Sequence, residues 1–348
     1  MNPSEQRLLG DEGDARDLRH MARAIELAGL ARPITAPNPW VGSVVVPAGE
    51  SGTTFEGTTA PPGGDHAEVA ALARAIAAGA AEGATLYTTL EPCSHHGRTP
   101  PCTDAIVAAG IARVVLGIVD PDDHVRGRGI AALEAAGIEV RTGVCEDAVA
   151  EQLAPYVKHR NTGRPWVVLK MALTLDGRIA APDGSSRWIT GEAARADAHR
   201  LRACSDAVLV GAATVRVDDP ALTVRLEDAD GAEPARQPLR VVLGNAAPDA
   251  RIQPAIELGG DLGAVLDELG SRGVVQVLVE GGARVAHDFH AAGLIDRYVF
   301  YVAPALSGGD DGRPVFAGPG AASMDEFWRG RLVSVERLGD DLRVEVAA

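Results

Sequence analysis

One histidine, one glutamate and two cysteines in the first third of the chain constrain its fold more than any other feature. Glu68 follows His66 by two positions, and Cys93 and Cys102 come after an intervening apolar segment. Imidazole and thiolate are ligands that zinc favours, and a catalytic zinc takes three protein ligands and leaves one position for water. The sequence therefore predicts a fold that brings His66, Cys93 and Cys102 together around one zinc ion per chain.

Glu68 adds a second requirement of hydrolytic chemistry to this set. Zinc lowers the pKa of bound water towards neutrality, and attack on an amidine-like carbon then needs a group that moves protons. Glu68 is close enough to His66 to do this without being a ligand. Zinc deaminases combine H-x-E with P-C-x-x-C and use the glutamate as acid and base. This chain departs from that pattern, because eight residues separate Cys93 from Cys102.

The long spacing between the cysteines points to one family. Residues 89–102 read Thr-Leu-Glu-Pro-Cys-Ser-His-His-Gly-Arg-Thr-Pro-Pro-Cys and closely resemble the deaminase half of the bifunctional deaminase–reductase family of riboflavin biosynthesis, in which the long loop is part of the pattern. Pro-Asn-Pro-Trp-Val-Gly at 37–42 and Gly-Arg-Gly at 127–129 extend the resemblance. It implies a cytidine-deaminase-like α/β/α domain, Glu68 as the catalytic residue, and contact between Asn38 and the substrate base.

Three alternatives remain open in this half. A structural zinc would need a fourth ligand, which His95 or His96 could supply, although Glu68 and the flanking motif fit only a catalytic site. Asn38 lies in a proline-bracketed turn, where an asparagine can bond its own backbone instead of a ligand. The resemblance suggests that residues 120–128 border the substrate, but their charges suit a solvated loop equally well.

Apolar periodicity and β-branched runs alternate through the first half. They predict helices at 16–30, 66–78, 103–109, 129–136 and 147–160, and strands at 41–46, 53–58, 84–90, 113–119 and 138–141. Pro33 should prevent the first helix from continuing, and Asp65 is a candidate cap of the second. Alternating strands and helices predict a mostly parallel sheet with helices on both faces.

The second half resembles the reductase half of the same family, which has a dihydrofolate-reductase-like α/β fold. The matching segments are Leu-Thr-Leu-Asp-Gly-Arg at 173–178, Ser-Ser-Arg-Trp-Ile-Thr at 185–190, and Thr-x3-Asp-Asp-Pro-x-Leu-Thr with a following arginine at 214–225. Helices are predicted at 191–203, 261–269 and 283–292, and strands at 166–172, 207–211, 239–243, 255–258, 274–280, 294–303, 332–336 and 342–346.

The cofactor of this half is expected to be NADPH. No G-x-G-x-x-G follows a strand, so a Rossmann site is not indicated. A glycine pair that opens a helix instead exposes backbone N–H groups for a phosphate. The resemblance implies cofactor contacts at Ala172, Trp188, Thr214, Asp218, Gly281, Gly282, Ala283, Arg284, Val285 and Ala286. The segment after Leu243 is short for the family, and a shortened sheet edge there could loosen binding of the adenosine or its 2′-phosphate.

The substrate of this half is expected to be a sugar phosphate. The resemblance implies contacts at Ser186, Arg202, Leu222, Arg225 and Glu280. Arginine suits phosphate because the guanidinium binds it bidentately and stays charged, although a surface salt bridge is the commoner fate of any one arginine. No residue stands out as the acid for ring opening of the ribose, and Lys170 is one candidate.

Length and charge set the outer limits of the prediction. A chain of 348 residues accommodates two domains, which we expect at 1–150 and 165–348 with a connector at 151–164. A formal net charge of −15 argues against nonspecific nucleic-acid binding, which depends on basic residues. The chain lacks both an apolar run of membrane-spanning length and a signal-peptide core, so we expect a cytoplasmic protein. As a separate expectation, the protein is a homo-oligomer.

The predicted function is that of a bifunctional enzyme acting on a small phosphorylated pyrimidine. The first domain would hydrolytically deaminate 2,5-diamino-6-(5-phosphoribosylamino)pyrimidin-4(3H)-one with zinc, and the second would reduce the ribosyl group to ribityl with NADPH. Two alternatives remain: a deaminase-only protein with a degenerate reductase domain, and a nucleic-acid deaminase.

Overall fold

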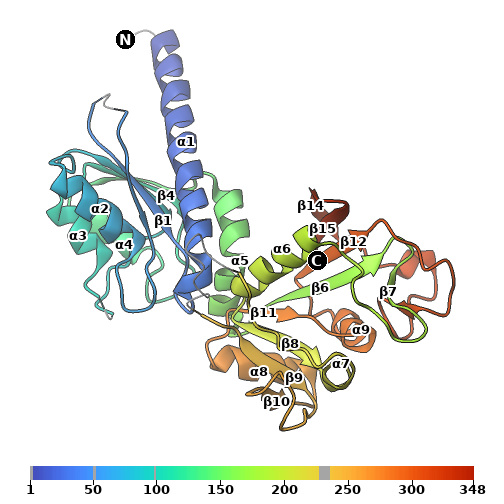
Figure 1. Ribbon diagram of the computed structural model, residues 1–348. Coiled ribbons are helices and arrows are strands. Elements are labelled where there is room, and N and C mark those ends of the chain that lie inside the picture. Colours follow the sequence, from blue (N-terminus) through green and yellow to red (C-terminus); the bar gives the residue numbers. More distant parts are fainter. Residues whose placement is uncertain (1–2, 50–51, 98, 227–235) are drawn as a thin grey trace. The chain divides into compact units, whose positions relative to one another are not determined.

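Two compact units, Met1–Thr162 and Gly163–Ala348, make up the chain. The computed structural model describes residues 3–49, 52–97, 99–226 and 236–348, with side chains from Asp14 onward (Figure 1). None of the helices in these ranges combines the length and the apolar composition that a transmembrane span requires.

The N-terminal unit is built on a five-stranded sheet with the order β2-β1-β3-β4-β5. β1 pairs antiparallel with both β2 and β3, whereas β3, β4 and β5 are parallel to one another. The strands are β1 (Gly42–Val46), β2 (Phe55–Thr58), β3 (Thr85–Leu90), β4 (Arg113–Ile118) and β5 (Glu139–Arg141).

Helices cover both faces of this sheet, as Figure 1 shows. One face carries α2 (Ala67–Ala77), α3 (Cys102–Ala108) and α4 (Arg128–Ala135), and the other carries α1 (Pro3–Thr35) and α5 (Glu146–Thr162). Two glycines permit the close packing of the second face. A Cβ on Gly42 would lie 2.0 Å from the carbonyl oxygen of Ala24 in α1, and one on Gly117 would lie 2.7 Å from Val149 in α5.

Four details of this unit differ from the sequence prediction. The sheet is mixed and not mostly parallel, because the short connection between β1 and β2 permits only antiparallel pairing. α1 begins at Pro3 and runs through Pro33 to Thr35; the proline removes one hydrogen bond and crowds the preceding turn, and the helix ends two residues later. His66, and not Asp65, is the N-cap of α2.

The helix before the second unit is also longer than predicted. α5 extends from Glu146 through Thr162, two residues beyond the predicted end of this helix at 160. The hydroxyl of Thr162 donates to the Lys158 carbonyl at 2.8 Å and completes the last turn. Gly163 follows with a φ of 72°, a left-handed conformation in which glycine commonly ends a helix.

An eight-stranded sheet with the order β10-β9-β8-β11-β6-β12-β15-β14 forms the C-terminal unit. The strands from β10 to β12 are parallel, and β15 and β14 are added antiparallel at one edge. The strands are β6 (Trp166–Thr174), β8 (Ala207–Gly211), β9 (Leu239–Leu243), β10 (Ile256–Leu258), β11 (Gln276–Val279), β12 (Arg297–Ala303), β14 (Arg331–Leu338) and β15 (Asp341–Ala347).

Two apolar clusters fix the helices of this unit to opposite faces of the sheet. α6 (Glu192–Ala203) and α7 (Ala212–Asp218) pack in a cluster that includes Ala198 and Val215. α8 (Leu262–Ser271) and α9 (Ala283–Ala291) pack in the other, which includes Leu266 and Phe289. Helices therefore cover both faces of this sheet.

The sequence prediction missed several short elements of the second unit. These are β7 (Arg178–Ala180), α7, β13 (Arg313–Pro314) and the 3-10 helix η1 (Met324–Glu326). Each is too short to display a helical or strand period. The only strand expected in the short stretch after Leu243 is present as β10, a three-residue strand at the sheet edge.

Candidate functional site

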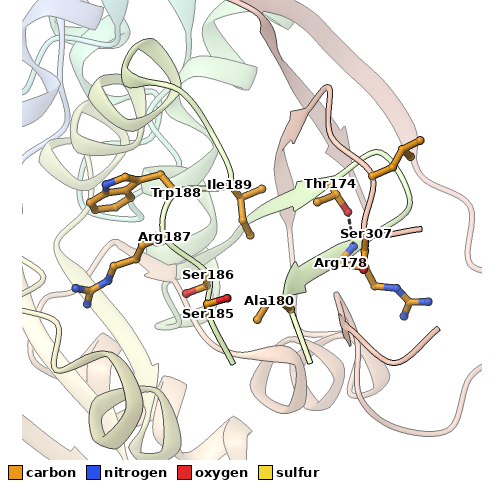
Figure 2. A pocket seen from close by; sticks show the side chains of 11 residues that line it. Thr174, Arg178, Ala180, Ser185, Ser186, Arg187, Trp188, Ile189 and Ser307 are labelled. Atoms are coloured by element: carbon orange, nitrogen blue, oxygen red, sulfur yellow. Dashed lines mark hydrogen bonds between the residues drawn. The ribbon is translucent and has the colours of Figure 1, made fainter. Parts of the chain in front are cut away.

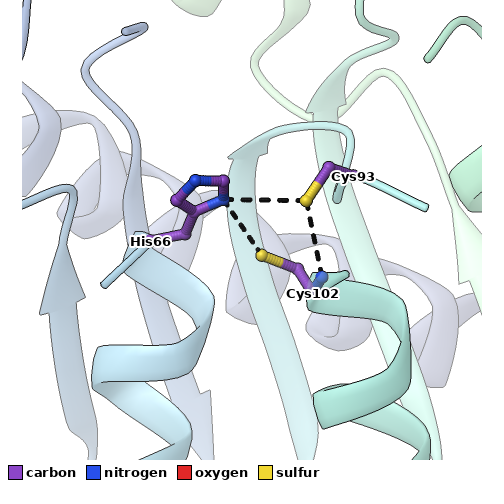
Figure 3. Close-up of side chains that lie close together, drawn as sticks. All are labelled: His66, Cys93 and Cys102. Carbon is purple, nitrogen blue, oxygen red and sulfur yellow. Dashed lines mark hydrogen bonds between the residues drawn. The ribbon is translucent and has the colours of Figure 1, made fainter. Parts of the chain in front are cut away.

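Three elements of the N-terminal unit bring one nitrogen and two sulfur atoms together. His66 is the N-cap of α2, Cys93 follows the carboxyl end of β3, and Cys102 is the first residue of α3. The Nδ1 atom of His66 lies 3.2 Å from the Cys102 sulfur and 3.7 Å from the Cys93 sulfur (Figure 3). All three ligand atoms lie within 4.8 Å of one another.

These separations suit a tetrahedral zinc ion. Bond lengths of about 2.3 Å to sulfur and about 2.0 Å to nitrogen place tetrahedral ligands roughly 3.6 Å apart. The backbone N–H of Cys102 also donates to the Cys93 sulfur at 3.4 Å, which favours a thiolate. The hydrogen bond from the Cys102 side chain lowers the pKa of Cys93 to about 4, and the same interaction raises the pKa of Cys102. The donor set therefore fits zinc.

The number of ligating side chains distinguishes a catalytic zinc site, which has three, from a structural one, which has four. Over the described ranges, three ligating side chains converge here and not four. His95 and His96, the candidates for a fourth ligand, are exposed in the loop between the two cysteines. Arg98 of that loop lies outside the described residues. A three-ligand set leaves one position of the tetrahedron for water, as a catalytic site requires.

Glu68 is the second residue of α2, in the first turn of the helix and two residues after the ligand His66. Its side chain belongs to the buried face of the helix and is 4% exposed. Burial raises the pKa of Glu68 to about 7, because the charged form is disfavoured away from water. A carboxyl group that titrates near neutrality can both accept and return a proton under physiological conditions.

Of the buried carboxyl groups in the first unit that sequence reasoning did not single out, two lie after neighbouring strands of the sheet. Glu91 is 3% exposed and Asp120 is 5% exposed, and they follow the adjacent ends of β3 and β4. Burial raises the pKa of Asp120 to about 6, and the hydroxyl of Tyr156 donates to its carboxylate at 3.2 Å. Their position after parallel strands was the available signal, since α/β sheets place function there.

Asn38 lies in the turn between α1 and β1. Its backbone N–H donates to the Thr35 carbonyl at 2.9 Å, which closes the turn through the backbone and involves no side-chain atom of Asn38. Its side chain is half-buried. Contact between Asn38 and a substrate therefore stays a prediction.

In the C-terminal unit, four of the predicted substrate residues lie in two groups that contact each other. Arg202 and Glu280 form one group, and the loop with Leu222 and Arg225 forms the other. The guanidinium of Arg202 on α6 bonds to both carboxylate oxygens of Glu280, which follows β11. Lys170 on β6 approaches the same carboxylate at 3.6 Å. Arg202 also donates to the Thr223 carbonyl at 3.2 Å, which ties the strand-end cluster to the loop that carries Leu222 and Arg225.

His199 is part of this cluster and was missed. Its Nδ1 atom accepts the backbone N–H of Arg225 at 3.2 Å. Burial, together with the charges of Arg202 and Arg225, lowers the pKa of His199 to about 4. The ring is therefore neutral near pH 7. The available signal was helical spacing, because His199 and Arg202 are three residues apart and share one face of α6.

Leu222 and the fifth predicted contact, Ser186, occupy different environments. The Leu222 side chain is 4% exposed and packs in the core, so contact with a ligand there would have to come from its backbone. Its φ of 51° places that backbone in the left-handed region. Ser186 lines an open pocket of about 230 Å³.

The pocket lies between the 185–189 loop and the β6–β7 turn (Figure 2). Trp188 lines it and is 69% exposed, with the Arg195 guanidinium 4.7 Å from its ring. The Arg187 side chain donates to the Asp218 carbonyl at 2.6 Å, so this loop meets the end of α7. Thr174 and Arg178 complete the opposite wall and were not predicted.

Thr214 and the segment from Gly281 to Ala286, which are among the predicted dinucleotide-binding residues, meet at the start of α9. The residues from Gly281 to Ala286 form the N-terminus of that helix, and Gly282 is an N-cap without a side-chain hydrogen bond. A Cβ on Gly282 would lie 3.3 Å from the Thr214 hydroxyl, so Thr214 on α7 faces this helix end. Backbone N–H groups at a helix start attract phosphate, which fits NADPH. Ala172 lies on β6, packed against the core.

Comparison with known proteins assigns both units. Residues 14–118 match the family described as cytidine and deoxycytidylate deaminase zinc-binding region, and residues 165–344 match RibD C-terminal domain. The chain is 44% identical to the riboflavin biosynthesis protein RibD of Mycobacterium tuberculosis over 339 residues, covering 94% of this chain and 96% of the relative. It is 37% identical to RibD of Escherichia coli, covering 94% and 98%.

Solved structures agree over the full length. Acinetobacter baumannii RibD is 39% identical, with a TM-score of 0.88 and coverage of 96% of this chain and 99% of that one. A diaminohydroxyphosphoribosylaminopyrimidine deaminase/5-amino-6-(5-phosphoribosylamino)uracil reductase from Thermotoga maritima is 35% identical, with a TM-score of 0.83 and coverage of 96% and 99%. The similarity extends over both units, and this chain belongs to the RibD family of riboflavin biosynthesis proteins.

Proposed function

We propose that this chain carries out two successive reactions of riboflavin biosynthesis, with His66, Cys93, Cys102 and Glu68 serving the first. The observation that carries the proposal is the convergence of three zinc-type ligand atoms within 4.8 Å, next to a buried glutamate. As a RibD protein, the chain is a zinc-dependent deaminase and an NADPH-dependent reductase. Residues 1–150 would serve the first activity and 165–348 the second, with 151–164 as the connector.

In the deamination, the side chains of the first unit divide the work. His66, Cys93 and Cys102 would hold the zinc, which when bound supplies a water that ionises near neutral pH. Glu68 would take the proton of the attacking water and give it to the departing ammonia. The pKa of about 7 that burial confers on Glu68 supports both steps. The substrate is 2,5-diamino-6-(5-phosphoribosylamino)pyrimidin-4(3H)-one, and Asn38 would contact its base.

In the reduction, the second unit would bind and orient. NADPH, bound at the start of α9, supplies the hydride. We assign its contacts to Ala172, Trp188, Thr214, Asp218 and the residues from Gly281 to Ala286. The sugar phosphate would be bound by Ser186, Arg202, Leu222, Arg225 and Glu280. Lys170 is the candidate acid for opening of the ribose ring, because its ammonium group lies 3.6 Å from the Glu280 carboxylate, within the cluster of proposed substrate contacts.

Two rival functions are less well supported. A degenerate reductase half would not be expected to keep Arg202, Glu280, Lys170 and His199 in one cluster. A nucleic-acid deaminase would be expected to carry a basic surface, whereas this chain has a net charge of −15.

The deciding experiment follows both reactions in one sample. Purified protein is incubated with the diaminopyrimidine substrate and NADPH, while ammonia release and cofactor absorbance are recorded. We expect ammonia first and NADPH oxidation after it. Ammonia without NADPH oxidation would leave only the deaminase. Activity on an RNA substrate and none on the pyrimidine would favour the nucleic-acid alternative.

We further propose a cytoplasmic homo-oligomer. Reducing conditions keep Cys93 and Cys102 available as thiolates, which the zinc site needs. The edge strand β14 exposes Leu332 and Val335 by 60% and 53%, and exposed apolar side chains on a sheet edge suit association with a second copy. Measuring the mass in solution by light scattering tests this, and a monomer at micromolar concentration would contradict it.

A further inference from the structure

The buried carboxylate of Glu91 joins two loops of the N-terminal unit. Glu91 follows β3 directly, and its backbone N–H donates to the Ile118 carbonyl at 3.1 Å. One carboxylate oxygen accepts the backbone N–H groups of Asp120 at 3.2 Å and Gly127 at 2.9 Å. The other accepts those of Gly129 at 2.9 Å and Ile130 at 3.3 Å. One side chain therefore binds both ends of the 119–128 loop.

Close backbone packing also holds the 119–128 loop against the segment that follows Glu91. A Cβ on Gly129 would lie 2.1 Å from the carbonyl oxygen of Pro92, the residue immediately before Cys93. Leu90 on β3 pairs with Ile118 on β4, so the two loops leave the sheet side by side. Glu91 and Gly129 thus hold the 119–128 loop against the segment that carries Cys93.

We propose that Glu91 is a positioning residue for the deamination: it fixes the 119–128 loop as one wall of the substrate site at a set distance from Cys93. Loops after the carboxyl ends of adjacent parallel strands line the sites of α/β sheets, and this loop is adjacent to the ligand-bearing one. Because four backbone N–H groups donate to the one buried carboxylate of Glu91, the 119–128 loop has little freedom to move. The inference rests on the proposed deamination at His66, Cys93 and Cys102.

A role in positioning makes a specific kinetic prediction. Glu91→Gln keeps the size of the side chain but replaces one acceptor oxygen by an NH2 group, which would face two backbone N–H groups. The loop should move away from Cys93 while the ligands stay in place. We expect the KM of deamination to rise about tenfold or more, with a smaller decrease in kcat. Glu91→Asp retains both acceptor oxygens on a shorter arm and should give an intermediate KM.

Gly129→Ala perturbs the same contacts without removing the Glu91 carboxylate, because a Cβ there would lie 2.1 Å from the Pro92 carbonyl oxygen and 3.1 Å from a Glu91 carboxylate oxygen. The new methyl group must push the Pro92 carbonyl and the 119–128 loop apart, so this variant should also raise KM. It also carries the test, together with Glu91→Asp, if Glu91→Gln does not fold. Glu134→Gln, on the exposed face of the same helix α4, is the matched control and should behave as wild type.

Three measurements on each full-length variant separate the outcomes: zinc content, deamination kinetics, and NADPH oxidation with supplied deaminated substrate. Full zinc, unchanged reduction and a raised KM for deamination would support the proposal. An unchanged KM, loss of zinc, or a fall in kcat alone would overturn it. Absence of deamination in the wild type would overturn the proposed function itself, and deamination in the wild type with no effect of Glu91→Gln would overturn only this inference.

Discussion

Arg202 and Glu280 face each other as a bidentate ion pair, with the terminal guanidinium nitrogen 2.9 Å from one carboxylate oxygen and Nε bonded to the other. Burial alone would raise the pKa of Glu280, but the charges of Arg202 and Lys170 lower it to about 2. Arg202 also donates to the Thr223 carbonyl. The pair therefore holds the loop that carries Thr223, and under the proposed function the exposed Arg225 side chain is the better placed of the two arginines to bind phosphate.

Arg202→Lys should impair the reductase selectively. Lysine keeps the charge but cannot bond both oxygens of Glu280 and the Thr223 carbonyl at once. We expect a loss of about 1–2 kcal/mol, roughly tenfold in kcat/KM for NADPH oxidation. The deaminase of the same chain is the internal control and should be unchanged. A parallel fall in both activities would indicate general destabilisation and contradict this role.

Glu68→Gln should separate zinc binding from proton transfer. The amide preserves the size of the side chain but cannot accept a proton from water, and general acid–base catalysis is worth about 10²–10⁴-fold. We expect a full complement of zinc, deamination lowered by about that factor, and normal reduction of supplied deaminated substrate. Deamination close to the wild-type rate would disprove the proton-transfer assignment.

Removal of the metal should abolish deamination and leave reduction unchanged. Chelation, or Cys102→Ser, takes away the zinc or one of its ligands, while the proposed NADPH site lies in the other unit. Deamination should disappear and reduction should persist, and adding zinc back should restore the chelated enzyme but not the variant. Cys204→Ser is the matched control and should retain zinc. Loss of the reductase on chelation would show that the halves are not independent.

The raised pKa of Asp120 predicts a pH-dependent stability. The folded protein holds this proton up to about pH 6, whereas the unfolded chain releases it near the ordinary value of 3.8. The contribution of Asp120 to stability is therefore greatest below 3.8 and is lost as the pH rises through about 6. Asp120→Asn does not titrate, so its stability relative to wild type should increase by about 1 kcal/mol between pH 5 and 7.5.

Denaturant unfolding of the N-terminal unit at both pH values measures this difference. The other titrating groups are common to both proteins and cancel. A difference that is independent of pH, or that decreases as the pH rises, would mean that Asp120 is ionised in the folded state at pH 5.

Much of the fold could be predicted from local pattern, because β-branched runs and apolar periodicity are properties of short segments. The errors follow from tertiary context. The sheet of the first unit is mixed, because β1 runs antiparallel to both of its neighbours, β2 and β3. The helix α7 has seven residues and shows no period, yet it presents Thr214 to the start of α9. His199 required knowledge of which loop covers α6.

The sequence by itself determined the chemistry: the types and spacing of His66, Glu68, Cys93 and Cys102 specify a zinc-type ligand set with a nearby carboxyl group. Only the tertiary structure decided which residues hold that chemistry in place. Glu91 binds backbone N–H groups, which every residue except proline carries, so no side chain marks its partners in the sequence. Arg202 and Glu280 are 78 positions apart, and only the strand order brings them together.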